Sequence, residues 1–336
     1  MIISRTPYRI SFFGGGTDYP EWYRVNGGQV LSTAINRYLH ISCRYLPPFF
    51  DHKIRLAYSV TEECKDFSQI DHPSVREVLR FLDIKDGLEI HFGGDLPGRS
   101  GTGSSSACTV GMLNALYAFK NERISPERLA NESINIEQNI IGEIVGSQDQ
   151  ISAAYGGFNH IKFKQDDSIE INPIDAKTYN LKQLDSKIML FFSGIRRTAE
   201  TVAKTYVEDL LNKEKQLFLM SEMVDKSLEI LKSNELDDFG RLLDETWRKK
   251  KELSKEVSNQ VIDDIYEIGK KCGALGGKIS GAGGGGFVFF YVPEENQLNL
   301  KEALSDLTHV PFNFEEEGSK IILNQNMDYM KNFSNV

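Results

Sequence analysis

Apolar residues fall in short runs along the first half of the chain and in longer amphipathic segments along the second. Runs rich in Ile, Tyr and Phe that Gly or Pro bound are typical of strands. Such runs predict strands over residues 8–13, 38–45, 53–58, 88–92 and 156–163. Apolar residues at helical spacing predict helices over residues 73–82, 104–119 and 126–144. The first half is therefore expected to mix strands and helices.

A polar connection over 166–186 separates this half from a second one, which begins with an apolar run over 188–192. The helical patterns of the second half cover residues 199–232, 236–253 and 260–272. Its strand patterns cover residues 276–279 and 287–292, and two further segments, 298–307 and 320–323, complete it. We therefore predict an α+β protein with mixed, largely antiparallel sheets, helices in both halves, and two domains, 1–180 and 181–336.

Composition narrows the class of protein. A chain of 336 residues is long enough to bury two cores of ordinary size. Its net charge of −9 argues against nucleic acid or an anionic membrane as the main partner, and no apolar run has membrane-spanning length. The N-terminal segment lacks the apolar core of a signal peptide, and the four cysteines form no CxxC pair. We expect a cytoplasmic protein with free thiols.

The segment 96–107, LPGRSGTGSSSA, lies between a predicted strand and a predicted helix. Residues 103–106 have no bulky side chain, and their backbone N–H groups lie where a helix leaves donors unpaired and its dipole is positive. Such a helix start attracts phosphate. A flexible linker is the alternative, but linkers are rarely held between two regular elements. The segment therefore predicts a phosphate-binding loop.

A second glycine cluster, GAGGGG at 281–286, has different surroundings. It matches the spacing of a dinucleotide fingerprint, but a strand follows where that motif needs a helix. The neighbouring Gly277-Lys278 is like the end of a P-loop, but Ile279 replaces the Ser or Thr that binds magnesium. A tight hairpin needs fewer glycines than this run contains. The run indicates a close backbone approach or a bound phosphate.

Two acidic residues fall where a carboxylate needs an explanation. Asp18 follows the glycine cluster 14–16, which suits either polyol binding or a surface turn with an Asx cap. Glu137 falls on the apolar stripe of the predicted helix 126–144, three residues after Ile134 and four before Ile141. A buried carboxylate there needs a positive partner such as Mg²⁺, whereas one at the edge of the stripe could reach solvent or an arginine.

Asp149 also has two interpretations. Ser147 and Gln150 have the spacing of a capping box, which predicts a short helix from this point. An acidic residue in the first turn of that helix is stabilised by the helix dipole. Alternatively, Asp149 takes a proton from a substrate hydroxyl. The local sequence does not choose between these interpretations.

In this order, the three glycine clusters resemble the GHMP small-molecule kinase family, which includes galactokinase, homoserine kinase, mevalonate kinase and phosphomevalonate kinase. Residues 5–19, RTPYRISFFGGGTDY, resemble the family's first motif, and residues 278–287, KISGAGGGGF, resemble its third. Residues 97–107 resemble its phosphate loop, with Thr102 in place of a leucine and Ser106 in place of an alanine. The match spans almost the whole chain. It implies a two-domain kinase fold with the active site in the cleft between the domains.

The resemblance also implies roles for individual residues. Asp149 corresponds to the catalytic aspartate, and Arg9 to the basic residue that stabilises this carboxylate and the transferring phosphoryl group. Ser104 and Glu137 correspond to the ligands of Mg²⁺. The phosphates of ATP would be bound by Pro97, Gly98, Arg99, Ser100, Gly101, Thr102, Gly103, Ser104 and Ser105.

The first motif, with GGGTDYPEW, resembles the sugar 1-kinase branch of the family. The implied reaction is phosphorylation of the anomeric hydroxyl of a small-molecule sugar phosphate, D-glycero-D-manno-heptose 7-phosphate, giving a 1,7-bisphosphate for surface-polysaccharide precursors. The candidate substrate residues are Thr17, Asp18, Tyr19, Gly283, Gly284, Arg196 and Arg197. The two arginines are candidates for the distal phosphate, although each could equally be a solvated surface residue. Monomer and homodimer both remain open.

Three other functions remain open at this point. The first is a fucokinase-like or galactokinase-like sugar 1-kinase, and the second is a catalytically silent sensor that binds sugar and ATP. The presence of all four implied catalytic and metal residues argues against the sensor. The third is an NAD-dependent dehydrogenase with 96–107 as a degenerate dinucleotide loop, a geometry that Pro97 and the extra residues 98–100 fit poorly.

Overall fold

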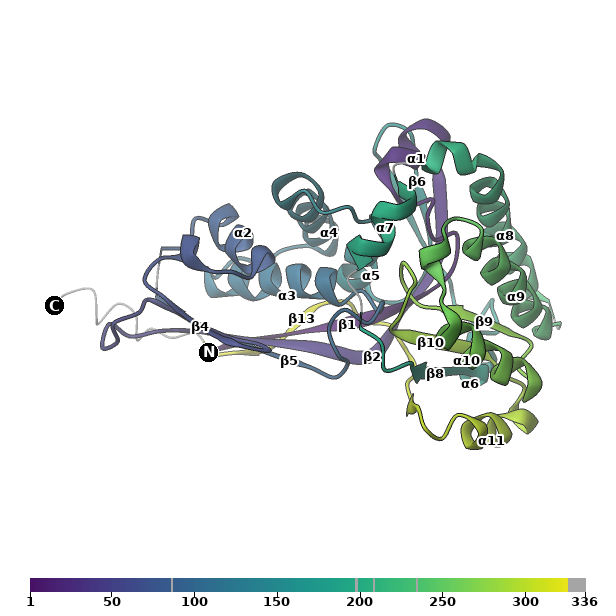
Figure 1. Ribbon diagram of the computed structural model, residues 1–336. Coiled ribbons are helices and arrows are strands. Elements are labelled where there is room, and N and C mark those ends of the chain that lie inside the picture. Colours follow the sequence, from purple (N-terminus) through teal and green to yellow (C-terminus); the bar gives the residue numbers. More distant parts are fainter. Residues whose placement is uncertain (86, 197–198, 208, 234, 326–336) are drawn as a thin grey trace.

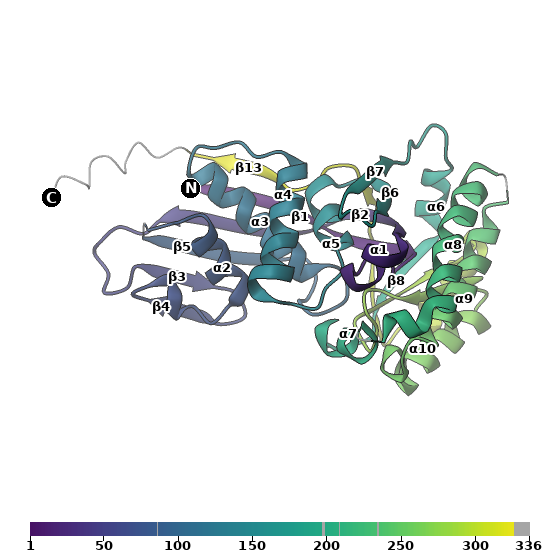
Figure 2. The same ribbon diagram turned by 90° about the horizontal axis from the view of Figure 1, so that it is seen from above.

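The chain folds into two lobes that share two long strands (Figure 1). The computed structural model describes residues 1–85, 87–196, 199–207, 209–233 and 235–325. Strands β1 (Ile2–Phe13) and β2 (Gly28–Tyr45) run from the first lobe toward the second (Figures 1 and 2). Each lobe combines a sheet with covering helices, so the predicted α+β class is confirmed.

The large sheet has nine strands in the described part of the chain, in the order β13-β1-β2-β5-β3-β4 along its main path. β1 and β2 pair antiparallel from Ile2 opposite Cys43 to Phe13 opposite Leu31. β6 and β12 also pair with β2, and β7 pairs with β6. The other strands are β3 (Ile54–Ala57), β4 (Thr61–Cys64), β5 (Leu88–Gly94), β6 (Phe158–Phe163), β7 (Ile169–Pro173), β12 (Phe314–Glu315) and β13 (Lys320–Asn324).

Helices cover one face of this sheet, as Figures 1 and 2 show from two directions. They are α2 (Pro73–Phe81), α3 (Ser104–Phe119), α4 (Pro126–Ile134) and α5 (Gln148–Tyr155), while α1 (Pro20–Asn26) lies toward the second lobe. Every residue of α3 from Ser106 to Ala118 is buried. A helix that is apolar all round belongs inside a protein, and α3 packs on both β1 and β2.

The second lobe is built on a four-stranded antiparallel sheet of described residues, in the order β11-β8-β10-β9. Its strands are β8 (Ile188–Phe192), β9 (Gly276–Ile279), β10 (Phe287–Tyr291) and β11 (Thr308–Val310). Its helices are α6 (Leu181–Lys187), α7 (Ala199–Val207), α8 (Glu214–Lys232), α9 (Asp237–Lys251), α10 (Gln260–Lys271) and α11 (Glu294–Ala303). The last strands, β12 and β13, return to the large sheet. The division at residue 180 stays a prediction.

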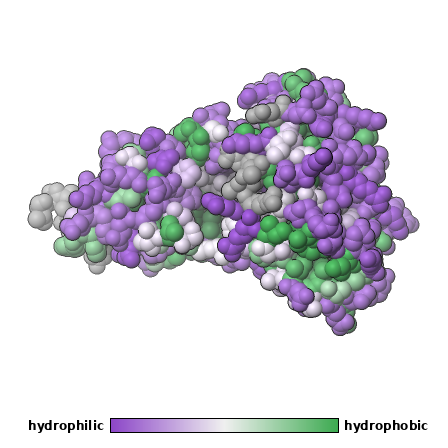
Figure 3. All heavy atoms as spheres, in the orientation of Figure 1, coloured by the Kyte–Doolittle hydropathy of each residue, from purple (hydrophilic) through white to green (hydrophobic). Residues whose placement is uncertain are grey.

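The two lobes share one apolar core. The ring centroid of Phe12 on β1 lies 5.4 Å from that of Phe239 on α9 and 5.7 Å from that of Phe289 on β10. The face seen in Figure 3 is mostly hydrophilic, and the largest apolar area that it exposes lies over the second lobe. No helix of the described residues is long and apolar enough to cross a membrane.

Several predicted elements are wrong in their limits. β2 begins at Gly28, ten residues before the predicted strand. The elements that were not predicted are α1, α6, β4, β7, β11 and β12. β4, TEEC, is polar at most positions and lacks the apolar pattern of a buried strand. β7, IEINP, alternates isoleucine with polar residues, but it is only five residues long and lies within the polar stretch 166–186. The predicted helix 126–144 leaves α geometry after Ile134 and continues as a π-helical segment, Asn135–Ile141.

Candidate active site

The loop that precedes α3 is held in shape by its own side chains. Ser100 Oγ donates a hydrogen bond to the Pro97 carbonyl at 2.6 Å, and the Arg99 backbone N–H donates to Ser104 Oγ at 3.2 Å. Gly103 precedes the helix with a left-handed φ of 75°, and no described side chain caps the first turn. The first N–H groups of α3 can therefore bind an anion.

The loop 280–286 packs on this phosphate loop through close backbone contact. A Cβ atom on Gly101 would lie 2.3 Å from the Ser280 carbonyl oxygen, and one on Gly286 would lie 2.1 Å from the Ser100 carbonyl oxygen. Ser280 Oγ also donates to the Gly101 carbonyl at 2.8 Å. The close backbone approach that the glycine run predicts is confirmed, because no side chain fits at these positions.

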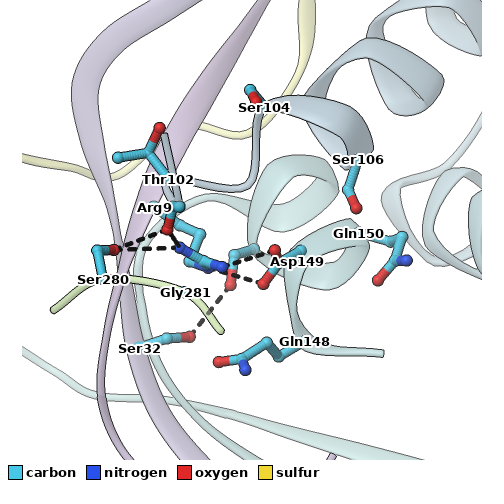
Figure 4. A network of polar contacts seen from close by, with 12 residues as sticks. Arg9, Ser32, Thr102, Ser104, Ser106, Gln148, Asp149, Gln150, Ser280 and Gly281 are labelled. Carbon is cyan, nitrogen blue, oxygen red and sulfur yellow. Dashed lines mark hydrogen bonds and ion pairs between the residues drawn. The ribbon is translucent and has the colours of Figure 1, made fainter. Parts of the chain in front are cut away.

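Arg9 and Asp149 form a bidentate ion pair beside the two loops (Figure 4). Nε and Nη2 of Arg9 donate to Oδ1 and Oδ2 of Asp149 at 2.7 Å and 2.6 Å, and Nη1 donates to the Gly101 carbonyl at 2.6 Å. A Cβ atom on Gly103 would lie 3.4 Å from Asp149 Oδ2. The carboxylate therefore lies against the start of α3, where the backbone can bind an anion.

Asp18 lies beside this ion pair in a buried turn. Its Oδ1 accepts a hydrogen bond from the Gly16 N–H at 3.0 Å, and its Oδ2 accepts one from Gln148 Nε2 at 2.9 Å. Burial raises the pKa of Asp18, and the charge of Asp149 raises it further against the opposing effect of the Gly16 hydrogen bond. Asp18 accepts this backbone hydrogen bond from the residue two positions before it, not two positions after it as in an Asx turn, and it is 2% exposed. The interpretation of this segment as a surface turn with an Asx cap is therefore wrong.

Glu137 occupies a second buried site, formed by the π-helical segment, α3 and α5. Its Oε2 accepts hydrogen bonds from Ser106 Oγ at 2.9 Å and from Gln150 Nε2 at 2.5 Å. Its Oε1 is buried and has no hydrogen-bond partner among the described residues. Burial raises the pKa of Glu137 to about 7. Burial of this carboxylate, the premise of its interpretation as a metal ligand, is confirmed.

α5 begins at the predicted place but without the predicted cap. The helix starts after Ser147, and the Ser147 side chain makes no capping hydrogen bond. Ser147 Oγ accepts a hydrogen bond from Gln138 Nε2 at 3.0 Å instead, and the Gln150 side chain donates to Glu137. The predicted capping box is wrong because two buried contacts take the side chains that it requires.

The predicted phosphate and metal residues differ in their surroundings. Ser104 makes no described hydrogen bond to Glu137, and in Figure 4 it lies away from Asp149, while Ser106 faces Gln150. Gly98, Arg99 and Ser105 are exposed, whereas Ser100 and Thr102 are fully buried. The carbonyl of Thr102 accepts a hydrogen bond from the Arg9 backbone N–H at 3.1 Å.

The predicted substrate residues are more scattered. The buried Thr17 hydroxyl lies 2.8 Å from the Gly14 carbonyl and 2.9 Å from the Gln29 carbonyl. Tyr19 meets Tyr206 of α7 edge-on, with ring centroids 6.2 Å apart. Gly283 and Gly284 pack on Val257, whose carbonyl accepts the Gly284 N–H at 2.9 Å. Arg196 is exposed, and Arg197 lies outside the described residues.

Two buried lysines lie near the ion pair, and the sequence patterns assign a role to neither of them. Lys278 is 1% exposed and donates to the Phe12 carbonyl at 2.9 Å. Lys250 is 4% exposed and donates to the Gly281 carbonyl. Burial lowers the pKa of both ammonium groups. Lys250 follows Leu243 and Trp247 at helical spacing, so the apolar stripe of α9 was the signal that could have identified it.

Comparison with known proteins places these contacts in a family. Residues 73–157 match the model of the GHMP kinases N terminal domain, and residues 227–308 match that of the GHMP kinases C terminal. The chain is also 30% identical over 335 residues to D-glycero-alpha-D-manno-heptose 7-phosphate kinase from Campylobacter jejuni, covering 95% of this chain and 98% of that protein. The chain belongs to the GHMP kinase family. The predicted resemblance is therefore confirmed.

Other GHMP kinases match more distantly. A galactokinase from Thermotoga petrophila is 27% identical, covering 89% of this chain and 92% of the relative. A solved D-glycero-D-manno-heptose 1-phosphate kinase from Bacteroides thetaiotaomicron, 23% identical, has a TM-score of 0.77 and covers 96% of this chain and 99% of its own. A solved putative sugar kinase from Campylobacter jejuni has a TM-score of 0.73 at 28% identity, covering 95% and 97%. These neighbours confirm the GHMP kinase fold.

Both matched GHMP domains contribute to the centre around Arg9. The N-terminal match includes the phosphate loop, Glu137 and Asp149, and the C-terminal match includes Lys250 and the loop 280–286. Their contacts meet at Gly101, which both Arg9 and Ser280 touch. The centre therefore lies where the two lobes join.

Proposed function

We propose that this chain is an ATP- and Mg²⁺-dependent sugar kinase that phosphorylates the anomeric hydroxyl of D-glycero-D-manno-heptose 7-phosphate. One observation supports phosphoryl transfer as the reaction. Nε and Nη2 of Arg9 hold the Asp149 carboxylate against Gly103, at the start of α3 where the backbone can bind an anion. Phosphoryl transfer needs a positioned proton acceptor, a cation and backbone N–H donors for the phosphates. The protein forms no covalent bond to the substrate, so it acts mainly by positioning and by stabilising charge.

In this mechanism, the substrate hydroxyl donates a hydrogen bond to Asp149. Its oxygen attacks the γ-phosphorus of ATP, the bond from that phosphorus to the ADP oxygen breaks, and the hydroxyl proton passes to Asp149. Arg9 keeps the carboxylate oriented, since two of its N–H groups bind both carboxylate oxygens. The N–H groups at the start of α3 bind the phosphates, and the loop 280–286 keeps the phosphate loop in place from the other side.

The Glu137 site has the donor set that Mg²⁺ prefers. Two buried oxygens there, Glu137 Oε1 and Gln150 Oε1, have no hydrogen-bond partner among the described residues. Mg²⁺ binds hard oxygen ligands and keeps several waters. When bound, the ion neutralises charge on the ATP phosphates. Glu137 would hold it directly, and Ser104 would reach it by turning its hydroxyl away from the Arg99 N–H.

The sugar substrate is proposed from two observations. The relative from Campylobacter jejuni named for heptose 7-phosphate matches over nearly its whole length. Next to Asp149, the Asp18 carboxylate and the unpartnered buried Gln148 Oε1 offer acceptors for sugar hydroxyl groups. Arg196 and Arg99 are exposed and are the described candidates for the distal phosphate, and Arg197 is a further one. Thr17 and Tyr19 would act indirectly, by fixing the turn that positions Asp18 for the substrate.

A panel of substrates tests this proposal. ADP release is measured with MgATP and each of heptose 7-phosphate, unphosphorylated heptose, fucose, galactose and mevalonate. We expect turnover with heptose 7-phosphate and a large loss when its phosphate is absent. Equal activity on fucose or galactose would contradict the substrate assignment, and no turnover on any sugar would favour a silent sensor of the same fold.

A further inference from the structure

The basic run at the end of α9 contains one lysine that differs from its neighbours. Arg248 pairs with Asp244 at 2.6 Å, Lys249 with Glu252 at 2.8 Å, and Lys251 with Asp263 at 3.3 Å. Lys250, the remaining member of the run, points inward and is 4% exposed. A buried ammonium group costs free energy unless it has compensating partners. The position of Lys250 therefore needs a reason other than solubility.

The Nζ atom of Lys250 donates to the carbonyl of Gly281, at the contact between the two glycine loops. A Cβ atom on Gly281 would lie 2.7 Å from the Cα of Gly101, whose carbonyl accepts from Arg9. The residue before Gly281 is Ser280, which also donates to Gly101. One lysine of the C-terminal lobe thus fixes the loop that backs the phosphate loop, opposite to Arg9 of the N-terminal lobe.

Charged groups from several elements face Lys250. Its charged neighbours are Arg9 on β1, Lys278 on β9, Asp18 and Asp149. Burial, followed by the charge of Arg9, lowers the pKa of Lys250 to about 7, while Asp18 and Asp149 oppose this effect. Asp149 is already bound by Arg9 through both oxygens. An anionic ligand beside Lys250 would therefore favour the charged ammonium form.

We propose that Lys250 is a positioning residue for phosphoryl transfer: its ammonium group, bound to the Gly281 carbonyl, holds the loop 280–286 against the phosphate loop on which the nucleotide phosphates bind. This inference rests on the proposed function for its effect on catalysis, but its effect on nucleotide binding does not require that the sugar be known. Because the bound phosphates favour the ammonium form, nucleotide and a proton on Lys250 bind cooperatively.

The kinetic test compares Lys250→Met, Lys250→Arg and the control Lys249→Met. Met retains the length of the lysine stem without its charge, so we expect a folded protein whose kcat falls by about 10²-fold, the loss typical of one electrostatic contact in a reaction centre. Arg should restore at least part of kcat, and Lys249→Met should behave like the unaltered chain. A Lys250→Met variant with unchanged kcat would overturn the proposal. Equal losses in Lys250→Met and Lys250→Arg would do the same, since they would indicate packing rather than charge.

A second test uses a non-hydrolysable ATP analogue with Mg²⁺ and no sugar. Calorimetry between pH 7.5 and 9 should show affinity falling as Lys250 loses its proton, by up to about tenfold per pH unit. This slope should be absent in Lys250→Met, and Lys250→Arg should keep its affinity at pH 9. The same slope in Lys250→Met as in the unaltered chain would refute the role of the lysine. If heptose 7-phosphate fails as a substrate while the slope behaves as expected, the substrate assignment alone fails.

Discussion

The two carboxylates near the start of α3, Asp149 and Glu137, differ in how the surrounding protein compensates their charge. Asp149 has both oxygens bound by Arg9, and the pair remains 23% exposed on the aspartate side. Glu137 is fully buried, has no described ion pair, and leaves Oε1 without a hydrogen bond. Figure 4 shows Asp149 of α5 pointing toward Arg9, with Gln150 on the side of Ser106. The Gln150 side chain donates to Glu137.

The difference indicates two tasks. A carboxylate that a cation of the protein binds through both oxygens is oriented before any ligand arrives, as a group that receives a substrate hydroxyl requires. A carboxylate whose burial raises its pKa to about 7 is poorly compensated, and an added cation would complete it. We therefore propose that Asp149 takes part in the reaction and that Glu137 binds the metal. The predictions below test this division, beginning with the largest effect.

Asp149→Asn should lower kcat by at least about 10³-fold, because the amide neither takes the proton nor forms the bidentate pair with Arg9. Nucleotide affinity should change little, since the phosphate loop is untouched. Stopped assays of ADP formation and calorimetry with an ATP analogue measure the two effects. Asp264→Asn on α10, which alters an exposed aspartate, is the matched control. Near-normal turnover in Asp149→Asn would remove the assigned role.

Glu137→Gln should have opposite effects on activity and stability. Loss of the metal ligand should lower kcat by about 10²-fold or more at fixed Mg²⁺. Without Mg²⁺, the variant should be more stable than the unaltered chain at pH 8, by up to about 3 kcal/mol.

The sign of this stability change follows from the raised pKa. The folded chain keeps the Glu137 proton up to about pH 7, whereas the unfolded chain loses it near the ordinary value of 4.5. The free energy of unfolding therefore falls as pH rises through this window, and the Glu137→Gln variant lacks this fall because glutamine does not ionise. Thermal unfolding of both proteins at pH 5 and pH 8 measures the difference. A variant less stable than the unaltered chain at pH 8 would show that the Glu137 charge is well compensated without metal.

Gly101→Ala should weaken nucleotide binding and stability, whereas Gly98→Ala in the same loop should not. A Cβ atom at Gly101 meets the Ser280 carbonyl and the backbone has a φ of +81°, so a loss of about 1–3 kcal/mol is expected. At Gly98 a Cβ atom would meet nothing within 4 Å. Unfolding midpoints and the KM for ATP measure both variants. Equal behaviour of the two would mean that the close loop contact is not required.

The smallest effect concerns pH. Because Glu137 takes up a proton below about pH 7, the apparent affinity for Mg²⁺ should fall by up to about tenfold per pH unit on the acid side. Titration of activity with Mg²⁺ at pH 6, 7 and 8 measures this dependence. Asp264→Asn should retain it. A Mg²⁺ affinity that is constant from pH 6 to pH 8 would separate the metal from Glu137.

The sequence predicted the fold class and the family because motif order and apolar periodicity are local properties. It placed Glu137 on an apolar stripe but left open whether the carboxylate is buried or reaches solvent at the edge of the stripe, and the structure shows that it is buried. It did not predict the capping failure at Ser147, since the competing partner Gln138 lies on another segment. Lys250 was missed because it stands in a run of solvated cations, and only the packing of α9 against the loop 280–286 distinguishes it. The sequence could not predict how close the three motifs lie to one another, because that depends on tertiary contacts between residues of different motifs.

The most direct test of the division between Asp149 and Glu137 measures metal binding in the two variants side by side. Mn²⁺ replaces Mg²⁺, and electron paramagnetic resonance reports the fraction bound to protein and ATP analogue. Asp149→Asn should bind Mn²⁺ with the analogue as the unaltered chain does, although it transfers no phosphate. Glu137→Gln should lose most of this binding. Retention of Mn²⁺ by Glu137→Gln together with its loss in Asp149→Asn would contradict the assignment.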